Sequence, residues 1–538
     1  MKLNNVFLLF NLCLSTLSFG QSGDFRFDIK EQFIAGFDGV QSFAIGVHEG
    51  EWLVVGGRKD GLHRRQPFAS FDQAGQNNSV WVINPETGQS WSTSINGLPQ
   101  GISEQLSSTN LEFWQSDTVL YLIGGYGYAP SEGDHITFPY LTAVDVPGAI
   151  NAVKNQQLIA PFFRQSAADE RLRVTGGYLI KLGNRYFLAG GQKFMGRYNP
   201  MGPTHGPGFE QQYTDQIRVF EIVDNGSGVF IDNYSVWSDT LNLHRRDYNA
   251  VPQIFPDGRS GFTMFSGVFQ HQQDIPWLNS VDVDSSGFVV NNQFNQLLNQ
   301  YHTAHLPMYD AIGNQMHTVF FGGLGRYYVD PASGLLVDDP NVPFVRTISR
   351  VTRNAMNQME EVKIGEMPAL LGTSGEFIPI ESGNIYQNGI LMLSQITSDS
   401  IVIGYILGGI SSSAPNIFFT NTGTESSASA KLYRISLIFK QSASDIETPV
   451  KAEKTSLKTT PNPTTGDIVI GLHLNETTPV SLALFDQFGR VALQMKSQVL
   501  AAGDHQFLIN LDFLPKGLYR VALMNNQTLI AATTISKN

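Results

Sequence analysis

The sequence has almost no cysteine and little charge. Its 538 residues include one cysteine, Cys13, and only 15% of them are charged, against about a quarter in an average soluble protein. Because Cys13 lies in an N-terminal segment that we expect to be removed, the mature chain forms no disulfide of its own and must be stabilised by packing. The formal charge of −12 is spread along the chain without a basic stripe, which argues against nucleic acid or an anionic membrane as a partner.

Long apolar runs are also missing beyond the N-terminus. Residues 1–20 combine one lysine, an apolar stretch over residues 6–17 and a small-residue exit, a pattern that indicates a secretory signal peptide. No later stretch approaches ~18 consecutive apolar residues, so we expect no transmembrane segment. Leu12 stands where a lipoprotein signal needs a small residue, so we expect no lipid anchor at Cys13.

What the sequence does contain is a repeat. Six short apolar runs end in small residues and follow polar turns, which is typical of the second strand of a hairpin. The closing glycines lie about 70 residues apart on average. The six runs are WLVVGG (52–57), LYLIGG (120–125), YFLAGG (186–191), FTMFSG (262–267), TVFFGG (318–323) and GYILGG (404–409).

Each repeat has the strand content of one propeller blade. In the first, we expect strands at 42–48, 52–57, 80–84 and 91–94, and four antiparallel strands make a blade. The double glycine and the segment INPETGQSW (83–91) resemble the kelch repeat, and this resemblance covers roughly residues 24–440. The predicted fold class is therefore all-β, a six-bladed kelch-like β-propeller followed by a small C-terminal β-sandwich.

The two ends of the repeat region complement each other. The sixth repeat lacks a fourth strand after KLYRISLIF (431–439), and FRFDIKEQF (25–33) reads as a strand with nothing before it. Pairing these segments closes the ring and removes two open sheet edges. The double glycines are expected to allow close backbone approach near the axis, because a phosphate-binding loop would need a following helix and a lysine.

The loops that follow the glycines are long, whereas the turns before them are short. Long loops on one face indicate a single functional face around the ring axis. These loops carry Arg58, His63, Arg64, Arg65, Tyr126, Tyr128, His135, Lys193, Arg197, Tyr198, His205, His271, Trp277, Arg326, Tyr327 and Tyr328. The blade-entry segments of the same face add Arg171, Arg173, His244, Arg245, Arg246, Tyr248, Tyr301, His302 and His305.

These residue types fit two roles. Aromatic rings stack on sugars and arginine forks bind carboxylates, so the face suits an anionic or glycan ligand. Arginine and tyrosine at blade entries equally serve to brace neighbouring blades through backbone carbonyls. The residues expected nearest the axis, and hence the candidate ligand-binding set, are Arg171, Arg173, Arg245, Arg246, His302 and Arg326.

We predict no metal and no cofactor. His302 and His305 are three residues apart, a spacing that suits a metal on a helix but not on an extended strand entry. The galactose-oxidase relatives of kelch propellers hold copper beside a cysteine crosslinked to tyrosine, and the mature chain has no cysteine. The repeated S-x-D-x-G-x-T-W turns of sialidase propellers are also missing.

From Thr459 onward the chain reads as several short alternating strands, a small β-sandwich. Its entry, central turn and C-terminal part contain a series of motif residues, namely Pro461, Asn462, Pro463, Gly466, Asp486, Gly489, Arg490, Gly503, His505, Leu514, Pro515, Gly517, Leu518 and Tyr519. With these residues the segment resembles the type A C-terminal sorting domain of the type IX secretion system of Bacteroidetes. The resemblance implies an export signal that is recognised by the secretion machinery and carries no catalytic residues.

The domain prediction is a signal peptide at 1–20, a propeller at 21–445, a linker at 446–458 and a sorting domain at 459–538. We predict a secreted or cell-surface binding or interaction protein, with a glycan or protein ligand on the long-loop face. The alternative is a carbohydrate-active enzyme, a lyase or mutarotase acting on acidic sugars. In a lyase, arginine would neutralise the carboxylate while tyrosine or histidine takes the adjacent proton. The sequence favours the binding protein and assigns no catalytic residue.

Overall fold

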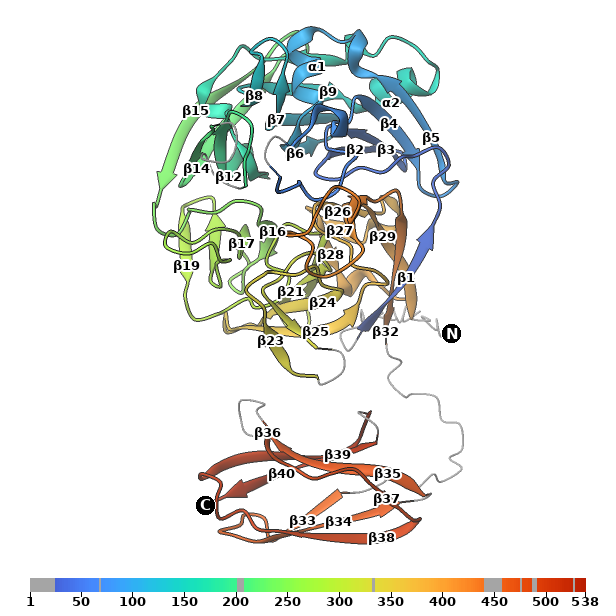
Figure 1. Cartoon of the computed structure of the whole chain (residues 1–538), viewed down its shortest axis with the longest axis vertical. Coiled ribbons are helices and arrows are strands. Elements are labelled where there is room, and N and C mark those ends of the chain that lie inside the picture. The colour runs from blue at the N-terminus through green and yellow to red at the C-terminus, as the bar shows by residue number, and fades with distance from the viewer. Residues whose placement is uncertain are drawn as a thin grey trace, which may run out of the picture. The chain divides into compact units, whose positions relative to one another are not determined.

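The computed structural model describes residues 25–66, 69–200, 208–330, 334–439, 457–474, 477–485, 491–525 and 528–538. The predicted signal peptide at 1–20 and most of the predicted linker at 446–458 lie outside these residues. The chain divides into two compact units, Met1–Gln441 and Ser442–Asn538. Both consist mainly of antiparallel strands, so the all-β class is confirmed (Figure 1).

The described residues of the first unit form six sets of four antiparallel strands. Set 1 has β2 (Ala44–His48), β3 (Glu51–Val55), β4 (Ser79–Asn84) and β5 (Gln89–Ser94). Set 2 has β6 (Thr109–Ser116), β7 (Val119–Ala129), β9 (Leu141–Asp145) and β10 (Phe163–Gln165). Set 3 has β11 (Thr175–Leu182), β12 (Arg185–Met195), β14 (Gln216–Asp224) and β15 (Val229–Ser238).

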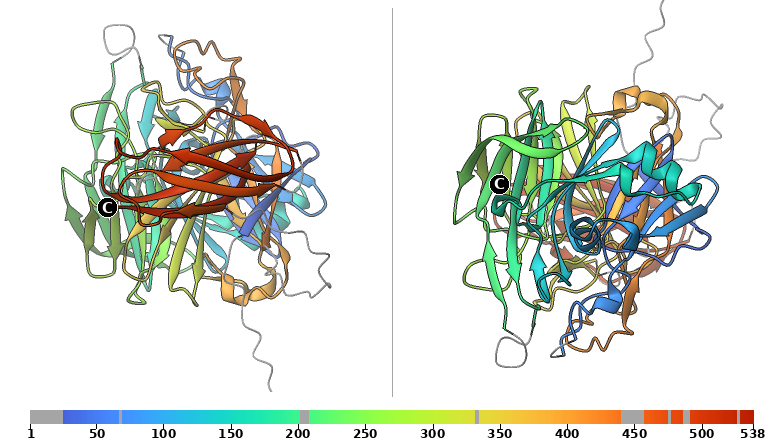
Figure 2. Two further views of the ribbon diagram at one scale, coloured as in Figure 1. Left: turned by 90° about the horizontal axis from the view of Figure 1, so that it is seen from below. Right: turned by 90° about the horizontal axis from the view of Figure 1, so that it is seen from above.

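The remaining sets follow the same plan. Set 4 has β16 (Asn249–Ile254), β17 (Ser260–Phe265), β18 (Ser280–Asp284) and β19 (Phe288–Asn291). Set 5 has β20 (His305–Asp310), β21 (Gln315–Phe321), β24 (Thr347–Arg353) and β25 (Met359–Glu366). Set 6 has β26 (Gly375–Pro379), β29 (Ser400–Gly408), β32 (Leu432–Phe439) and β1 (Phe25–Gln32). The long pair β14 and β15, in green, lies side by side in both views of Figure 2.

Several short elements that the sequence did not predict lie between these strands. Strand β8 pairs with both β7 and β12, which joins sets 2 and 3 into one sheet, and β28 pairs in parallel with β20. The extra strands are β8 (Asp134–Thr137), β13 (Glu210–Tyr213), β22 (Tyr327–Val329), β23 (Leu336–Asp338), β27 (Tyr386–Gln387), β28 (Ile390–Met392), β30 (Ile410–Ser412) and β31 (Ser426–Ala428). The α-helices are α1 (Gln100–Leu106) and α2 (Val146–Lys154). Single 3₁₀ turns occur at Gln73–Gly75, Ile95–Gly97, Ala160–Phe162, Glu170–Leu172, Ser382–Asn384 and Leu393–Gln395.

The apolar runs of the repeat are the second strands of the sets, as predicted. In β3, residues 52–55 are all 2% exposed or less, because both faces of the strand are covered. A short continuous apolar run bounded by turns is the pattern of such a buried strand. The fourth strand β5 (QSWSTS) instead alternates between partly buried and exposed positions, which places it at the outer edge of its sheet.

Strand β1 completes set 6, as its unpaired sequence predicted. All eight of its residues pair antiparallel with β32, from Phe25 opposite Phe439 to Gln32 opposite Leu432. In Figure 1 the blue β1 lies beside the orange β32, although about 400 residues separate them in the chain. The first and last strands of the unit therefore share one sheet.

The closing glycines join each set to the next. The backbone N–H of the last glycine of every run donates to a carbonyl that precedes the following set, over 2.8–3.2 Å. The six bonds run from Gly57 to Ser108, Gly125 to Val174, Gly191 to Arg245, Gly267 to Gln300, Gly323 to Leu371 and Gly409 to Val40. The last of these returns from set 6 to set 1, so the chain of contacts is closed.

Glycine is required because the backbones approach so closely. At Gly322, φ is +66° and a β-carbon would lie 2.0 Å from the carbonyl oxygen of Leu371. Any larger residue would have to push the next set away. This explains the double glycines by packing, in agreement with the structural interpretation of the sequence.

A second ring of hydrogen bonds links the residues that enter the first strands. The backbone N–H groups of Asn110, Asp247, His302, Ser374 and Ser42 each donate to the entry segment of the preceding set, over 2.8–3.1 Å. The remaining step is made by the Thr175 hydroxyl, which donates to the Asn110 carbonyl over 3.2 Å. The sets thus follow one another in chain order around a common centre, as Figure 1 shows from blue through green to orange.

The second unit packs two sheets around its own core. One sheet contains β33 (Leu457–Thr460), β34 (Ile468–Leu474) and β38 (Gly503–Ile509). The other contains β35 (Thr478–Phe485), β36 (Val491–Gln494), β37 (Gln498–Leu500), β39 (Gly517–Asn525) and β40 (Thr528–Lys537). Buried residues from both sheets, including Ile470, Leu484 and Val521, form one hydrophobic cluster. This arrangement is a β-sandwich.

Candidate functional site

A cavity of about 530 Å³ lies where the sets converge, and all six contribute to it. The lining residues come from the long loops after the second strands, from the segments that enter the first strands, and from the strand ends beside them, such as Tyr126 in β7 and Phe194 in β12. This is the face on which the sequence places the long loops. The aromatic and ionisable lining residues are Arg58, His63, Arg65, Phe71, Tyr126, Phe194, Tyr198, Arg246, Asp247, Phe269, Asp274, Tyr301, His302, Phe344, Phe418 and Phe419.

Aromatic rings form one side of the cavity. Phe71 from the first long loop packs edge-on against Tyr126, with the centroids 5.2 Å apart, and lies 6.0 Å from Tyr198. The Tyr126 hydroxyl donates to the Gly196 carbonyl over 2.7 Å and accepts from the Tyr198 N–H over 3.0 Å. The loops of sets 1, 2 and 3 are therefore held together around these rings, and their faces and edges offer stacking surfaces for a ligand.

Arg58 is a structural brace in the cavity wall. It is 4% exposed, and its Nε and Nη2 bind the two carboxylate oxygens of Asp60 over 2.7 and 2.6 Å. Nη2 also donates to the Asp72 carbonyl over 2.7 Å. A bidentate ion pair of this kind satisfies most of the guanidinium and fixes the start of the first long loop.

Arg246 is the first of two predicted residues that line the cavity. It forms an ion pair with the carboxylate of Asp247, and its Nε donates to the Tyr213 hydroxyl over 3.0 Å. Its guanidinium lies 5.2 Å from the ring centroid of Phe269. The Tyr213 ring stacks on His244 with a centroid separation of 3.8 Å, so the Arg246 side chain is held from several sides.

His302 is the second predicted residue that lines the cavity. Its Nε2 lies 3.2 Å from the carboxylate oxygen Oε1 of Glu376, which comes from the first strand of the next set. The ring also packs edge-on against Tyr178, with the centroids 5.6 Å apart.

His305 does not join His302 at the cavity. Its Nδ1 contacts the Thr303 carbonyl over 3.0 Å, and burial lowers its pKa. Among the residues that the structure describes, no group of three or more histidine, cysteine, aspartate or glutamate side chains is arranged to hold a metal ion.

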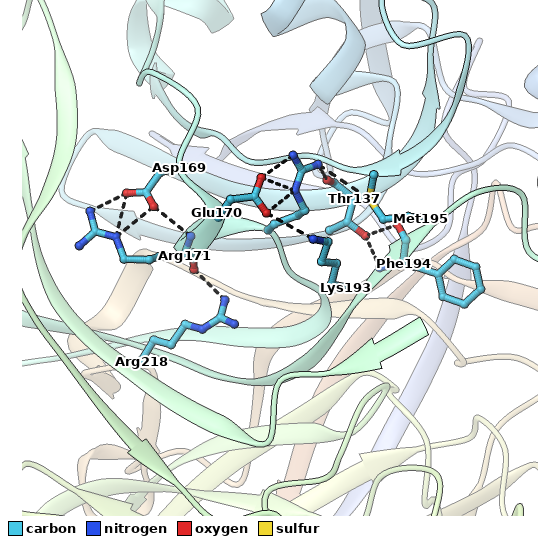
Figure 3. A network of polar contacts seen from close by, with 9 residues as sticks. Thr137, Asp169, Glu170, Arg171, Lys193, Phe194, Met195 and Arg218 are labelled. Atoms are coloured by element: carbon cyan, nitrogen blue, oxygen red, sulfur yellow. Dashed lines mark hydrogen bonds and ion pairs between the residues drawn. The ribbon is translucent and has the colours of Figure 1, made fainter. Parts of the chain in front are cut away.

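The predicted residues Arg171 and Arg173 lie outside the cavity lining and are paired locally. Figure 3 shows Arg171 beside Asp169 in this network of polar contacts. Arg171 binds Asp169, with Nη2 and Oδ2 2.6 Å apart. Arg173 binds Glu170, with Nη2 and Oε1 2.8 Å apart, and also donates to the Thr137 carbonyl. Both carboxylates belong to the same short turn as the arginines. These side chains stabilise the entry to set 3.

Arg245 and Arg326 also lie outside the lining. Arg245 is fully buried, and it donates to the carbonyls of Asn242, Ser266 and Asn279 over 2.7–2.9 Å. Burial lowers its pKa to about 9. Arg326 binds the carboxylate of Asp338 over 2.6 and 2.9 Å. Arg245 is thus an internal brace that satisfies backbone carbonyls, and Arg326 closes its own loop.

The candidate set chosen from the sequence left out several lining residues. Phe71, Phe194, Asp247 and Asp274 carry no motif, and their position in a long loop or an entry segment is the signal that could have found them. Glu376 is a single acid in a strand, and only the contact between neighbouring sets brings it to His302.

A second hollow of about 710 Å³ lies in set 5. Its lining comes from the ends of β20, β21, β24 and β25, with Leu393 added, and it has no phenylalanine, tyrosine or tryptophan. His317 in its wall contacts the Thr352 hydroxyl over 2.9 Å, and burial lowers the His317 pKa to about 4. The central cavity is the stronger candidate, because aromatic and polar groups from all six sets converge on it.

Comparison with solved structures gives remote similarity. A structure titled "Structure of YjhT" is 10% identical with a TM-score of 0.42, covering 74% of this chain and 97% of that chain. A copper complex titled as a fungal alcohol oxidase of the AA5 family is 10% identical with a TM-score of 0.38, covering 96% of this chain and 99% of that chain. No curated protein matches the sequence.

In the described part of the chain, no helix is long and apolar enough to cross a membrane.

The C-terminal unit has a clear match. A family model described as "Secretion system C-terminal sorting domain" matches residues 458–537, almost the same segment as the one predicted from the sequence motifs. Residues 458–537 are therefore a type IX sorting domain, which directs the protein to the cell surface or the extracellular space.

Proposed function

We propose that the protein is a secreted or cell-surface binding protein that takes a glycan in the central cavity. In this proposal the six strand sets are the blades of a six-bladed, kelch-like β-propeller, and the cavity is the mouth of its axis. The observation that carries the proposal is the composition of the cavity. It has a volume of about 530 Å³, within the range of small-molecule sites, and combines aromatic rings with polar groups on loops from all six sets.

The geometry suits a sugar for a physical reason. A sugar presents flat C–H faces and a rim of hydroxyl groups, which need stacking surfaces and hydrogen-bond partners respectively. Phe71, Tyr198 and Phe418 provide rings, and Tyr301 provides a hydroxyl for which the described residues contain no hydrogen-bond partner. The loops are braced to each other, as by the bond from Arg197 Nε to the Ser70 carbonyl over 2.8 Å, so the cavity is largely pre-formed.

A glycan array on the mature protein tests this proposal. Hits would then be titrated against Tyr301→Phe, which removes one cavity hydroxyl, and against Tyr309→Phe as a matched control. The Tyr309 hydroxyl contacts Asn314 over 3.0 Å, at the end of β20 away from the cavity lining. We expect Tyr301→Phe to weaken binding about 2- to 10-fold and Tyr309→Phe to leave it unchanged. Absence of any hit, or equal effects of the two variants, would reject the cavity as a glycan site.

The blade assignment has its own test. Deletion of residues 25–32 would remove the fourth strand of set 6 and expose the edge of β32. We expect an aggregated or poorly folded product. A soluble product that unfolds cooperatively at the temperature of the intact protein would contradict ring closure by β1.

One observation favours a second candidate, a lyase or mutarotase acting on acidic sugars. His302 lies in the cavity wall beside the Glu376 carboxylate, and Arg246 lies on the same wall. Histidine is a side chain that can abstract a proton beside a sugar carboxylate, and an arginine would stabilise the resulting charge. Ultraviolet absorbance of unsaturated products from acidic glycans would reveal a lyase, and His302→Gln should abolish it.

A further inference from the structure

The cavity wall contains three arginines, and they differ in how their charge is balanced. Arg58 is paired with Asp60 and Arg246 with Asp247. For Arg65 we find no carboxylate within ion-pair distance among the residues that the structure describes. A cation that lines a cavity without a partner acid is available for a charge supplied by a ligand.

The Arg65 side chain is held by aromatic contacts. Its guanidinium carbon lies 4.3 Å from the ring centroid of Phe419 and 5.7 Å from that of Phe418. Stacking uses the flat face of the guanidinium and leaves its N–H donors pointing outward from the edges. The Nε atom is buried and has no hydrogen-bond partner. An unsatisfied buried donor costs free energy, so the protein itself does not use the full donor capacity of this guanidinium.

His63, two residues before Arg65, has a second buried polar atom without a hydrogen-bond partner. Its Nδ1 is buried without a hydrogen-bond partner, and its ring contacts Phe71, Tyr198 and Phe418 with centroid separations of 5.1–5.8 Å. Burial lowers the His63 pKa to about 4, so the ring is neutral at neutral pH and one of its nitrogens carries a proton. Phe418 touches both His63 and Arg65, which places the two side chains around one ring.

The segment that carries these residues is anchored at Leu62, which directly precedes His63. The Leu62 N–H donates to the Ser426 hydroxyl over 2.9 Å, and the Asn421 side chain donates to the Leu62 carbonyl over 2.6 Å. Ser426 and Asn421 belong to the long loop of set 6, which also carries Phe418. The loops of sets 1 and 6 therefore hold Arg65 and His63 in place before any ligand arrives.

We propose that Arg65 and His63 form an anion subsite that binds the carboxylate of a sugar acid, stacked beside Phe418 and Phe419. This inference rests on the proposed function, and it specifies the class of glycan. A carboxylate is favoured because its two coplanar oxygens match the donor edge of a guanidinium that is fixed by stacking. A sugar sulfate is the competing anion, and the test includes it.

The experiment compares acids with their neutral forms on the mature protein. Calorimetric titrations would use galacturonate and glucuronate oligomers, their methyl esters, and a sulfated galactose oligomer. We expect an acid to bind at least 10-fold more tightly than its ester, and Arg65→Gln to remove this preference without weakening the ester. Arg64→Gln is the matched control, because Arg64 is the neighbour that lies outside the cavity lining. It should behave like the wild type.

The outcomes separate the two proposals. Equal affinity for acid and ester would overturn the anion subsite and leave the glycan site intact. A preference for the sulfated oligomer over the uronates would overturn the assignment to a carboxylate. If no oligomer binds in any form, both proposals fail. Arg65→Lys keeps the charge but loses the fork, so it should retain only part of the acid preference, and full retention would contradict recognition by the guanidinium.

Discussion

The same tetrapeptide occurs twice in the chain with opposite structural roles. Leu-His-Arg-Arg stands at 62–65, in the long loop of set 1, and again at 243–246, at the entry to set 4. In the second copy every polar side chain has partners: His244 contacts Asp215 over 2.8 Å, Arg245 binds backbone carbonyls, and Arg246 binds Asp247. In the first copy, His63 Nδ1 and Arg65 Nε are buried without any.

The difference shows what separates a brace from a binding group. Arg245 is surrounded by carbonyls from the entry segment, from β17's end and from the start of β18, so its donors are used within the protein. Arg65 is surrounded by aromatic rings, which hold it but accept no conventional hydrogen bond. The same residue type therefore contributes stability at Arg245 and has a donor without a partner at Arg65.

The largest expected effect comes from Arg245→Met. The substitution keeps a long apolar stem but leaves the carbonyls of Asn242, Ser266 and Asn279 without their donor. Since each unsatisfied buried acceptor costs about 1–3 kcal/mol, we expect a loss of ~3 kcal/mol or more and a clearly lower melting temperature. Thermal unfolding followed by circular dichroism would measure this, with Arg64→Met as the control. An unchanged melting temperature would remove the basis for calling Arg245 a brace.

The fold was largely predictable because it repeats. Apolar runs, glycines and turns recur six times, so a strand that is hard to assign in one repeat can be assigned from the others. The pairing of β1 with β32 was predictable because the sixth repeat lacks a fourth strand and the N-terminal strand has no partner before it. The bridging strand β8 and the parallel pairing of β28 with β20 were not predictable, because long loops encode them without a repeated pattern.

The sequence predicted on which face of the repeat region the candidate site lies. It did not predict which residues line the cavity, apart from Arg246 and His302 in the candidate set. Position in a long loop or entry segment located the cavity lining, whereas proximity to strand ends selected Arg171, Arg173 and Arg245, whose charges or donors are used locally. Whether an arginine is paired depends on acids or carbonyls brought together by the fold. Asp169 and Glu170 were visible next to Arg171, but the carbonyl partners of Arg245 were not.

Arg246→Gln should produce the next largest effect. It removes the partner of Asp247 and the donor to the Tyr213 hydroxyl, leaving a carboxylate at the cavity wall without its counter-charge. We expect destabilisation of about 1–3 kcal/mol in urea unfolding. Adding Asp247→Asn should recover part of the loss, since the unpaired charge is then gone. A double variant less stable than Arg246→Gln alone would contradict this account.

The pH dependence of stability tests the burial of His63. The folded-state pKa of His63 is about 4, below the 6.5 of the unfolded chain, because burial disfavours its charged form. As pH falls from 6.5 towards 4, the unfolded state takes up a proton that the folded state does not, so stability declines across this window and not above it. His63→Phe should show a shallower fall of melting temperature between pH 7 and 5 than the wild type. Parallel curves would show that His63 does not contribute.

The smallest expected change in stability, and one of opposite sign to that of Arg245→Met, comes from Arg65→Met. Methionine retains contact with Phe418 and Phe419 but removes the buried Nε donor that has no partner. Removing an unsatisfied buried polar group is neutral or stabilising, so we expect a change between zero and about +1 kcal/mol in urea unfolding. The same substitution at Arg245 in the other tetrapeptide should cost several times that amount. If both substitutions destabilise the protein equally, Arg65 has protein partners as Arg245 does, and the contrast between a brace and a binding group fails. If Arg65→Met is neutral or stabilising while it also weakens binding of an acidic sugar, then the first copy gives up stability that the second copy retains, as expected for a site built for a ligand.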